Sequence, residues 1–240
     1  MEKKMHGVVV IDGVRTAFGK AGEKGVFWKT RADDLAVALL KALVQRNPAV
    51  RPDMIEDSIW GVTNQVKEQG GTIGRAVPML ADWGWNVPGC SIDRMCASGL
   101  TAIGFGVGYI ATGMAECLLT GGVEHMGHVP MGFMRDPHPR LQEVMGGPSA
   151  FNMGMTAENI HDRFPEFTRD MADRYAVSCQ QKAHQAIQSG KMKSMIVPIE
   201  VERSDGTKVV VDKDQQPRPE TSMESLAGLK AVFKENGRVT

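Results

Sequence analysis

Net charge is the first property that this sequence lacks. Its 28 lysine and arginine residues are balanced by 28 aspartate and glutamate residues, and its pI is about neutral. With no overall positive field, the composition argues against a protein drawn to nucleic acid or to anionic membranes by net charge. No stretch approaches the ~20 consecutive apolar residues of a membrane helix, and residues 1–12 carry no apolar run typical of a secretory signal.

Aromatic residues are also scarce, at 6% of the chain, whereas 27 glycines and 16 methionines are present. This balance predicts close backbone packing and adaptable apolar surfaces. The sequence has only four cysteines, which lie far apart without a C-x-x-C pair: Cys90, Cys96, Cys117 and Cys179. Scattered single cysteines are typical of a reducing compartment, so we expect free thiols and a cytoplasmic protein.

Cys96 lies where a strand is expected to turn into a helix. Residues 91–95 form a short run that leads into Cys96, and small and apolar residues then continue to Gly113. The first N–H groups of a helix have no partner within the helix, and the helix dipole favours negative charge there. Because the thiolate is the nucleophilic form of cysteine, Cys96 is a candidate nucleophile on a strand-to-helix elbow. The alternative is a cysteine that packs as a small apolar side chain, which we expect of Cys90 and Cys117.

Strands and helices alternate along the first half of the sequence, which predicts an α/β fold with parallel βαβ units. We expect strands at residues 7–11, 58–62, 91–95 and 116–120, and helices at residues 33–46, 73–83 and 98–113. The first of these strands, at residues 7–11, is expected to be buried because all but its glycine are apolar and branched.

The composition changes near residue 123. A long loop rich in Met, Gly, Pro and His covers residues 123–154, and a loop of that length is usually functional or disordered. We expect the remaining elements to be helices at 156–164 and 168–189, a hairpin at 196–201 and 208–211, and a short helix at 220–229. The sequence therefore predicts an α/β domain at residues 1–122 and a loop domain at residues 123–240. Residues 233–240 resemble a turn that leads into another strand, so we expect a piece of a longer protein.

Polar side chains follow the strand expected at residues 116–120. Glu124, His125 and His128 offer one carboxylate and two imidazoles just after its end. Because ligands gather at the carboxyl ends of strands in α/β sheets, we expect a polar site that faces the Cys96 pocket. A metal site is disfavoured, since the H-E-x-x-H order is absent and zinc needs three or four ligands.

Two other stretches have an ordinary explanation beside the functional one. Residues 104–111 match G-x-G-x-x-A, but the match lies inside an expected helix, so close helix packing is the preferred interpretation. Arg218 lies between two prolines and is a candidate phosphate ligand or a solvated loop residue.

Taken together, these stretches resemble the thiolase family, whose members cleave or form 3-ketoacyl-CoA with coenzyme A. The matching stretches run in order along the chain: residues 15–19 (Arg-Thr-Ala-Phe-Gly), 33–36 (Asp-Asp-Leu-Ala), 61–75, 93–100 (Asp-Arg-Met-Cys-Ala-Ser-Gly-Leu), 121–126 (Gly-Gly-Val-Glu-His-Met), 153–159 (Met-Gly-Met-Thr-Ala-Glu-Asn) and 218–221 (Arg-Pro-Glu-Thr). The run at residues 124–131 looks most like the degradative bacterial 3-ketoacyl-CoA thiolases of fatty-acid oxidation. The resemblance implies a mixed sheet with helices on both faces, and an α+β loop domain inserted after the fourth strand.

The resemblance also implies roles for single residues. Cys96 matches the nucleophile that takes the acyl group, Met153 matches a methionine of the acyl and pantetheine pocket, and Arg218 matches an arginine of the coenzyme A-binding region. Two positions depart from the family pattern. Ala97 stands where glycine is common, and Asn152 stands where some members carry histidine.

The implied reaction is a two-step acyl transfer through Cys96, with acyl-CoA and coenzyme A as substrates and no permanently bound cofactor. The resemblance further implies a homodimer or homotetramer, and association with other β-oxidation enzymes is a further expectation. The family's Gly-His-Pro base, late Cys-x-Gly acid/base and Asn-Glu-Ala-Phe motif are missing from the sequence, so we expect the chain to be inactive alone. A ketoacyl synthase-like condensing enzyme and a non-catalytic thiolase-like assembly module stay open as alternatives.

Overall fold

The computed structural model describes residues 5–240, which form two compact units. Of the described residues, the first unit contains residues 5–133 and Met192–Gln216, and the second contains Met134–Lys191 and Pro217–Thr240. Residues 123–133 and 192–216, expected in the loop domain from the sequence, belong to the first unit in this division. A functional domain boundary at residue 122 stays a prediction.

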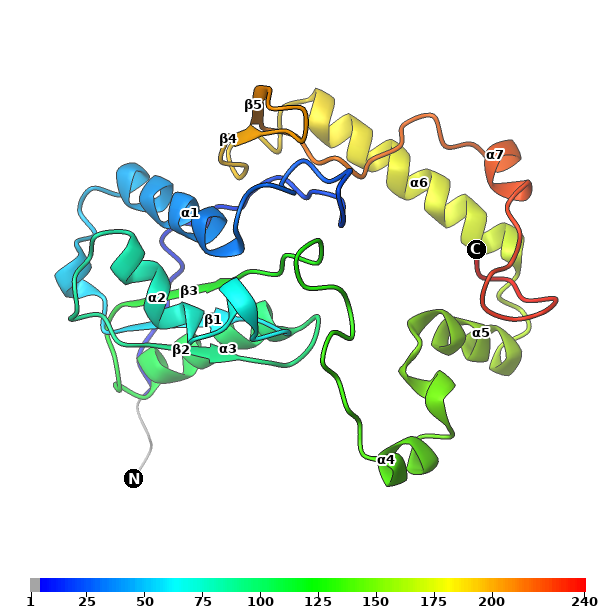
Figure 1. Cartoon of the computed structure of the whole chain (residues 1–240), viewed down its shortest axis with the longest axis horizontal. Coiled ribbons are helices and arrows are strands. Elements are labelled where there is room, and N and C mark those ends of the chain that lie inside the picture. The colour runs from blue at the N-terminus through cyan, green and yellow to red at the C-terminus, as the bar shows by residue number, and fades with distance from the viewer. Residues whose placement is uncertain (1–4) are drawn as a thin grey trace. The chain divides into compact units, whose positions relative to one another are not determined.

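A three-stranded parallel sheet forms the centre of the first unit (Figure 1). Its order is β2 (Gly89–Ile92), β1 (Asp57–Gly61) and β3 (Leu118–Gly122), and Ile59 pairs with Cys90 on one side and Thr120 on the other. The chain passes from β1 to β2 through α2 (Ile73–Leu80) and from β2 to β3 through α3 (Ser98–Ala111). The expected parallel βαβ units are therefore confirmed.

Helices cover both faces of this sheet (Figure 1). Trp60 packs in a buried cluster with Leu40 of α1 (Ala32–Arg46) and Val77 of α2. Neighbouring residues of a strand point to opposite faces, and the next residue, Gly61, lies against α3, where a Cβ atom would collide with the backbone of Ser98 and Gly99. The absence of a side chain at Gly61 therefore allows the start of α3 to sit directly on the end of β1.

The expected buried strand at residues 7–11 is wrong. These residues form no strand, and Val9 and Val10 are 80% and 81% exposed. A strand needs a neighbour to pair with its backbone groups, and the three parallel strands place none beside this segment. The strand expected at residues 116–120 is consequently the third strand of the described chain rather than the fourth.

An antiparallel hairpin completes the first unit. β4 (Ile199–Glu202) pairs with β5 (Lys208–Val211), and Gly206 in the turn has φ +84°, a conformation that glycine adopts without strain. Buried Ile199 and Val211 pack with Phe27, which lies in the Gly-rich loop at residues 14–31. Two short 3-10 turns, Pro52–Met54 and Lys67–Gln69, connect the earlier elements.

The second unit is helical. It contains α4 (Pro139–Val144), a 3-10 turn (Pro148–Phe151), α5 (Met153–Arg163), α6 (Arg169–Gln188) and α7 (Met223–Ala227). The Thr168 side chain caps α6 by accepting from the Met171 N–H. The loop expected at 123–154 is partly wrong, because α4 and the 3-10 turn lie within it, and no strand forms at residues 233–240. No helix among residues 5–240 is long and apolar enough to cross a membrane.

Candidate active site

Cys96 is exposed on the tight connection between β2 and α3. β2 ends at Ile92, Ala97 precedes the helix as its N-cap residue, and α3 begins at Ser98. The residue before the cysteine, Met95, has φ +50°, a left-handed conformation that a non-glycine residue adopts only at an energetic cost. The predicted strand-to-helix elbow is thus present, and its sharp turn presents the thiol to solvent.

Local hydrogen bonds hold this strained turn. Asp93 Oδ1 accepts from the Met95 N–H at 2.7 Å, and the Ser98 hydroxyl donates to the Met95 carbonyl at 2.6 Å. The Ser98 oxygen also accepts from the Arg94 N–H at 2.8 Å. The peptide groups on both sides of Met95 are therefore fixed, which sets the direction of the next side chain, Cys96.

The other three cysteines lie in different surroundings. Burial raises the pKa of the Cys90 and Cys117 thiols, and the nearby carboxylates of Asp57 and Glu56, respectively, raise them further. These are the two cysteines expected to be structural. Cys179 is exposed on the long helix α6, away from any helix start. Cys96 alone combines exposure with a place at a helix N-terminus, where negative charge is favoured.

A shallow hollow of about 390 Å³ lies beside the elbow. Its lining comes from the elbow and the first two turns of α3, namely Arg94, Ala97, Leu100, Thr101, Gly104 and Phe105. The G-x-G-x-x-A match at residues 104–111 lies within α3, where Gly106 approaches the Thr120 side chain of β3. This position supports the packing interpretation of these glycines, and it is not the strand-to-helix position of a dinucleotide site.

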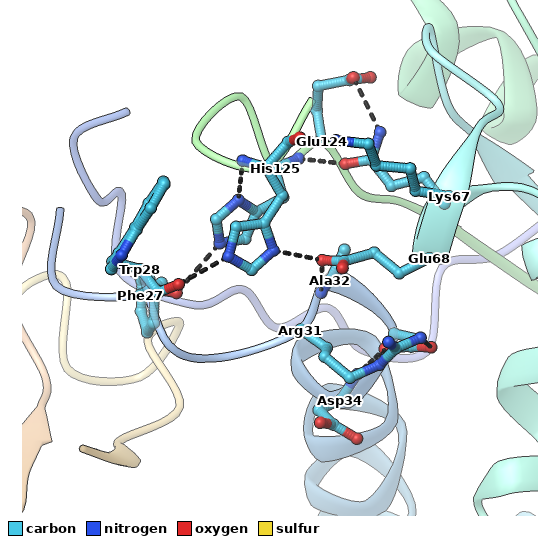
Figure 2. A network of polar contacts seen from close by, with 12 residues as sticks. Phe27, Trp28, Arg31, Ala32, Asp34, Lys67, Glu68, Glu124 and His125 are labelled. Atoms are coloured by element: carbon cyan, nitrogen blue, oxygen red, sulfur yellow. Dashed lines mark hydrogen bonds and ion pairs between the residues drawn. The ribbon is translucent and has the colours of Figure 1, made fainter. Parts of the chain in front are cut away.

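Glu124 gathers polar groups at the carboxyl edge of the sheet. Its two oxygens accept from the Thr63 N–H at 2.8 Å, the Asn64 amide at 3.0 Å and the Gln69 amide at 3.0 Å. Gln69 is fully buried, and its oxygen accepts from the His125 N–H. Figure 2 shows Glu124 beside His125 in this network. The Thr63 hydroxyl donates to the Met95 carbonyl at 3.1 Å, so the network reaches the elbow.

The two histidines instead turn toward the Gly-rich loop. Their rings stack at 3.8 Å between centroids, and their Nε2 atoms lie 3.0 Å and 2.6 Å from the carbonyl oxygens of Phe27 and Trp28. His128 Nδ1 lies 2.8 Å from Glu68, whose carboxylate also accepts from the Ala32 N–H at the start of α1 (Figure 2). The predicted polar site therefore has two separate parts. Glu124 connects through Thr63 to the elbow, whereas His125 and His128, with Glu68, hold the loop at residues 14–31; we call these three residues the histidine clasp.

This clasp contains three groups that offer metal-binding atoms within 4.8 Å of one another, Glu68, His125 and His128. Both Nε2 atoms face carbonyl oxygens, which accept and cannot donate, so each carries a proton rather than a lone pair. His125 Nδ1 accepts from the His128 N–H at 3.1 Å. The chemistry is that of a hydrogen-bonded clasp rather than of a metal centre.

Met153 and Arg218 belong to the second unit. Met153 is the first residue of α5 and is 77% exposed, and Asn152 caps that helix by accepting from the Gly154 N–H at 2.9 Å. The exposed Arg218 donates its N–H to the Gln180 side chain of α6 at 2.7 Å. Cys96 belongs to the first unit, so the roles expected for Met153 and Arg218 around the acyl group stay predictions.

Sequence reasoning missed Thr63 and Gln69. Each touches its partner over a long sequence separation, 32 residues for Thr63 to Met95 and 55 for Gln69 to Glu124. The one available signal is their position after a buried strand, the usual place for polar site residues in parallel sheets.

The fold and the elbow define an α/β protein with parallel βαβ units and an exposed cysteine at a helix N-terminus. Comparison with known proteins then identifies the family. A family model described as "Thiolase, N-terminal domain" matches residues 8–240. The chain belongs to the thiolase family, and the resemblance drawn from its motifs is confirmed.

The similar proteins agree with this assignment. The 3-ketoacyl-CoA thiolase of Vibrio vulnificus is 39% identical over 237 residues, which are 98% of this chain and 60% of that protein. The protein of the same name from Marinomonas sp. is 41% identical over 233 residues, 97% of this chain and 59% of that protein. The crystal structure of the Bacillus anthracis acetyl-CoA acetyltransferase matches with a TM-score of 0.83 and 31% identity, over 100% of this chain and 62% of that one. The thiolase fold is therefore confirmed, and the chain spans about 60% of the length of the relatives it matches.

Proposed function

We propose that this chain carries the acyl-accepting nucleophile of a 3-ketoacyl-CoA thiolase, and that the nucleophile is Cys96. The observation that supports the proposal most directly is the exposed Cys96 thiol on the β2–α3 elbow, which Asp93 and Ser98 hold through hydrogen bonds to Met95. Family membership and the names of the relatives support the reaction class.

The proposed reaction transfers an acyl group twice. The Cys96 thiolate attacks the ketone carbon of 3-ketoacyl-CoA, and the bond between that carbon and the neighbouring methylene breaks. Its electron pair leaves with acetyl-CoA as the enolate, which then takes a proton. The thiol of a second coenzyme A attacks the acyl-enzyme and gives up its proton, and Cys96 leaves as a thiolate. N–H groups at the start of α3 would favour the negative charge that develops on the ketone oxygen during the attack.

The substrates are accordingly acyl-CoA and coenzyme A, and Cys96 itself holds the acyl group, so the reaction needs no permanently bound cofactor. Met153 would line the acyl and pantetheine pocket, and Arg218 would meet a coenzyme A phosphate through its exposed guanidinium. The same proposal places the chain in fatty-acid β-oxidation. It also includes a homodimer or homotetramer and association with other β-oxidation enzymes. All four cysteines are free, as is usual in the cytoplasm.

Competitive alkylation of the four cysteines tests the proposal. Under limiting iodoacetamide, peptide mass spectrometry should find Cys96 modified before Cys179, the other exposed cysteine. Cys90 and Cys117, whose pKa values are raised by burial, should react last. Equal rates at Cys96 and Cys179 would count against a nucleophile at residue 96.

Turnover separates the nucleophile from the complete reaction. The sequence has no Gly-His-Pro motif to supply the family's base, so we expect no appreciable consumption of acetoacetyl-CoA by this chain alone. A rate comparable to that of an intact thiolase would show that the chain supplies its own base. Loss of that rate in Cys96→Ala would still assign the nucleophile.

A further inference from the structure

The carbonyl of Met95 receives a hydrogen bond from outside the elbow. The Thr63 hydroxyl, just beyond the end of β1, donates to it at 3.1 Å. The bonds from Ser98 and Asp93 come from the elbow itself and move with it. Thr63 therefore ties the strained residue before Cys96 to the end of β1.

Thr63 is itself held by Glu124, just beyond the end of β3. Glu124 Oε2 accepts from the Thr63 N–H at 2.8 Å, and its other oxygen accepts from the side chains of Asn64 and Gln69. A carboxylate only accepts hydrogen bonds, so the Thr63 N–H and the amides of Asn64 and Gln69 all find an acceptor in Glu124.

Gln69 keeps Glu124 in this orientation. Its amide nitrogen donates to Glu124 and to the Asn64 carbonyl, each at 3.0 Å, and its oxygen accepts from the His125 N–H. Because Gln69 is fully buried, any change in its position would leave polar groups without partners, which is costly. Buried Gln69 thus fixes the carboxylate that fixes Thr63.

We infer that Glu124 is a positioning residue for Cys96 and that it acts through Thr63. This inference rests on the proposed nucleophilic role of Cys96. Glu124 orders the end of β1, Thr63 then holds the left-handed Met95 peptide, and that peptide sets where the Cys96 thiol lies relative to the start of α3. Loss of the Thr63 hydroxyl removes the hydrogen bond between the elbow and the end of β1, and the benefit of the helix N-terminus for the thiolate becomes weaker.

Alkylation rates in Thr63 variants test this inference. Thr63→Val removes the hydroxyl and keeps the shape, and Thr63→Ser keeps the hydroxyl. We expect Thr63→Val to slow iodoacetamide alkylation of Cys96 by about fivefold, the effect of losing one neutral hydrogen bond. Thr63→Ser should restore the rate, and the rate at Cys179 should not change in either variant.

Thr112→Val is the matched control. The Thr112 hydroxyl donates to the Gly108 carbonyl at 2.8 Å at the other end of α3. Its loss should leave the Cys96 rate unchanged. General loosening of the fold would instead speed the alkylation of Cys90 and Cys117, and circular dichroism would show a loss of helix signal.

The inference is overturned if Cys96 in folded Thr63→Val is alkylated as fast as in the unmodified chain. It is also overturned if Cys96 reacts as slowly in Thr63→Ser as in Thr63→Val, or if Thr112→Val slows the alkylation of Cys96 by the same factor. If Thr63→Val does not fold, Glu124→Gln carries the test. The new amide NH2 group faces either the Thr63 N–H or the side-chain amides of Asn64 and Gln69, so at least one of these donors loses its acceptor. Cys96 should again react more slowly than in the unmodified chain. A Cys96 rate equal to that of Cys179 in the unmodified chain would instead remove the proposed nucleophile itself.

Discussion

Arg15 and Asp214 join two parts of the first unit that lie 199 residues apart. Arg15 Nη1 and Nη2 donate to the two carboxylate oxygens of Asp214 at 2.7 Å and 2.9 Å, and the Phe18 N–H donates to the same carboxylate at 2.8 Å. The Arg15 side chain is also 5.0 Å from the Phe18 ring. The Arg-Thr-Ala-Phe-Gly motif, which contributed to the family resemblance, therefore anchors the segment that follows β5.

Asp214→Asn tests the strength of this connection. Hydrogen bonding to Arg15 holds the pKa of Asp214 below its ordinary value, so the carboxylate is charged near neutral pH. The amide loses the charge and one acceptor, and we expect the free energy of unfolding to fall by about 2 kcal/mol, typical for hydrogen bonds to charged groups. Urea unfolding measures the change. Asp53→Asn is the control, because Asp53 forms a similar pair with Arg51 on the exposed surface and should give no measurable change.

Glu68 gives the histidine clasp a predictable response to acid. Burial alone would raise the pKa of Glu68, but the Ala32 N–H and the His128 ring outweigh it, and the pKa lies below the ordinary value of 4.5. A lowered pKa contributes stability that is fully present above 4.5 and is lost as the pH falls through the folded-state pKa. Glu68→Gln should therefore lower the thermal midpoint at pH 7, and the difference from the unmodified chain should shrink in acid.

Thermal unfolding between pH 7 and pH 3 measures that difference. The exposed Glu166→Gln is the control and should leave the midpoint unchanged across the range. A difference between Glu68→Gln and the unmodified chain that stays constant down to pH 3 would contradict a role for the Glu68 charge.

Two glycine substitutions should have opposite effects. A methyl group at Gly61 would collide with the backbone of Ser98 and Gly99, whereas nothing lies within 4 Å of a methyl group at Gly104 on the open side of α3. Gly61→Ala should lower the free energy of unfolding by about 1–3 kcal/mol, as overpacking does, and should also slow alkylation of Cys96. Gly104→Ala should raise stability by up to about 1 kcal/mol, because alanine favours a helix. Urea unfolding of both variants decides the point.

The sequence was a good guide where a pattern is local. The elbow at Cys96 follows from a strand, a turn and a run of small residues that are adjacent in the chain. Thr168 likewise lies directly before the helix that it caps. Residues 7–11 show the limit. An apolar run has the composition of a strand, but it forms one only where another strand supplies hydrogen bonds, and that depends on the whole sheet.

The polar contacts around the candidate site show the same limit. Glu124 and His128 were identified as polar residues after a strand, yet their partners Thr63 and Glu68 lie about 60 residues earlier. Periodicity describes one element at a time and carries no information about which side chains meet across elements. The elbow pattern and the family resemblance both predict Cys96 as the nucleophile, but neither gives information about the residues that hold it in place.

Glu158 makes the last prediction, in the second unit. Its carboxylate, 1% exposed, accepts from the Arg238 N–H at 2.9 Å and 3.0 Å and from the Val239 N–H at 2.8 Å. Burial alone would raise its pKa, but these N–H groups hold it below the ordinary value, so the charged form binds residues 238–239. Glu158→Gln removes the charge and replaces one of the two acceptor oxygens with an amide donor.

Hydrogen exchange at Arg238 and Val239 measures the consequence of that substitution. We expect both amides to exchange at least about tenfold faster in Glu158→Gln, the effect of losing a hydrogen bond to a charged acceptor. The exposed Glu143→Gln on α4 should leave their exchange unchanged. Equal protection of residues 238–239 in both variants would mean that the helices of the second unit, rather than the Glu158 carboxylate, hold this segment.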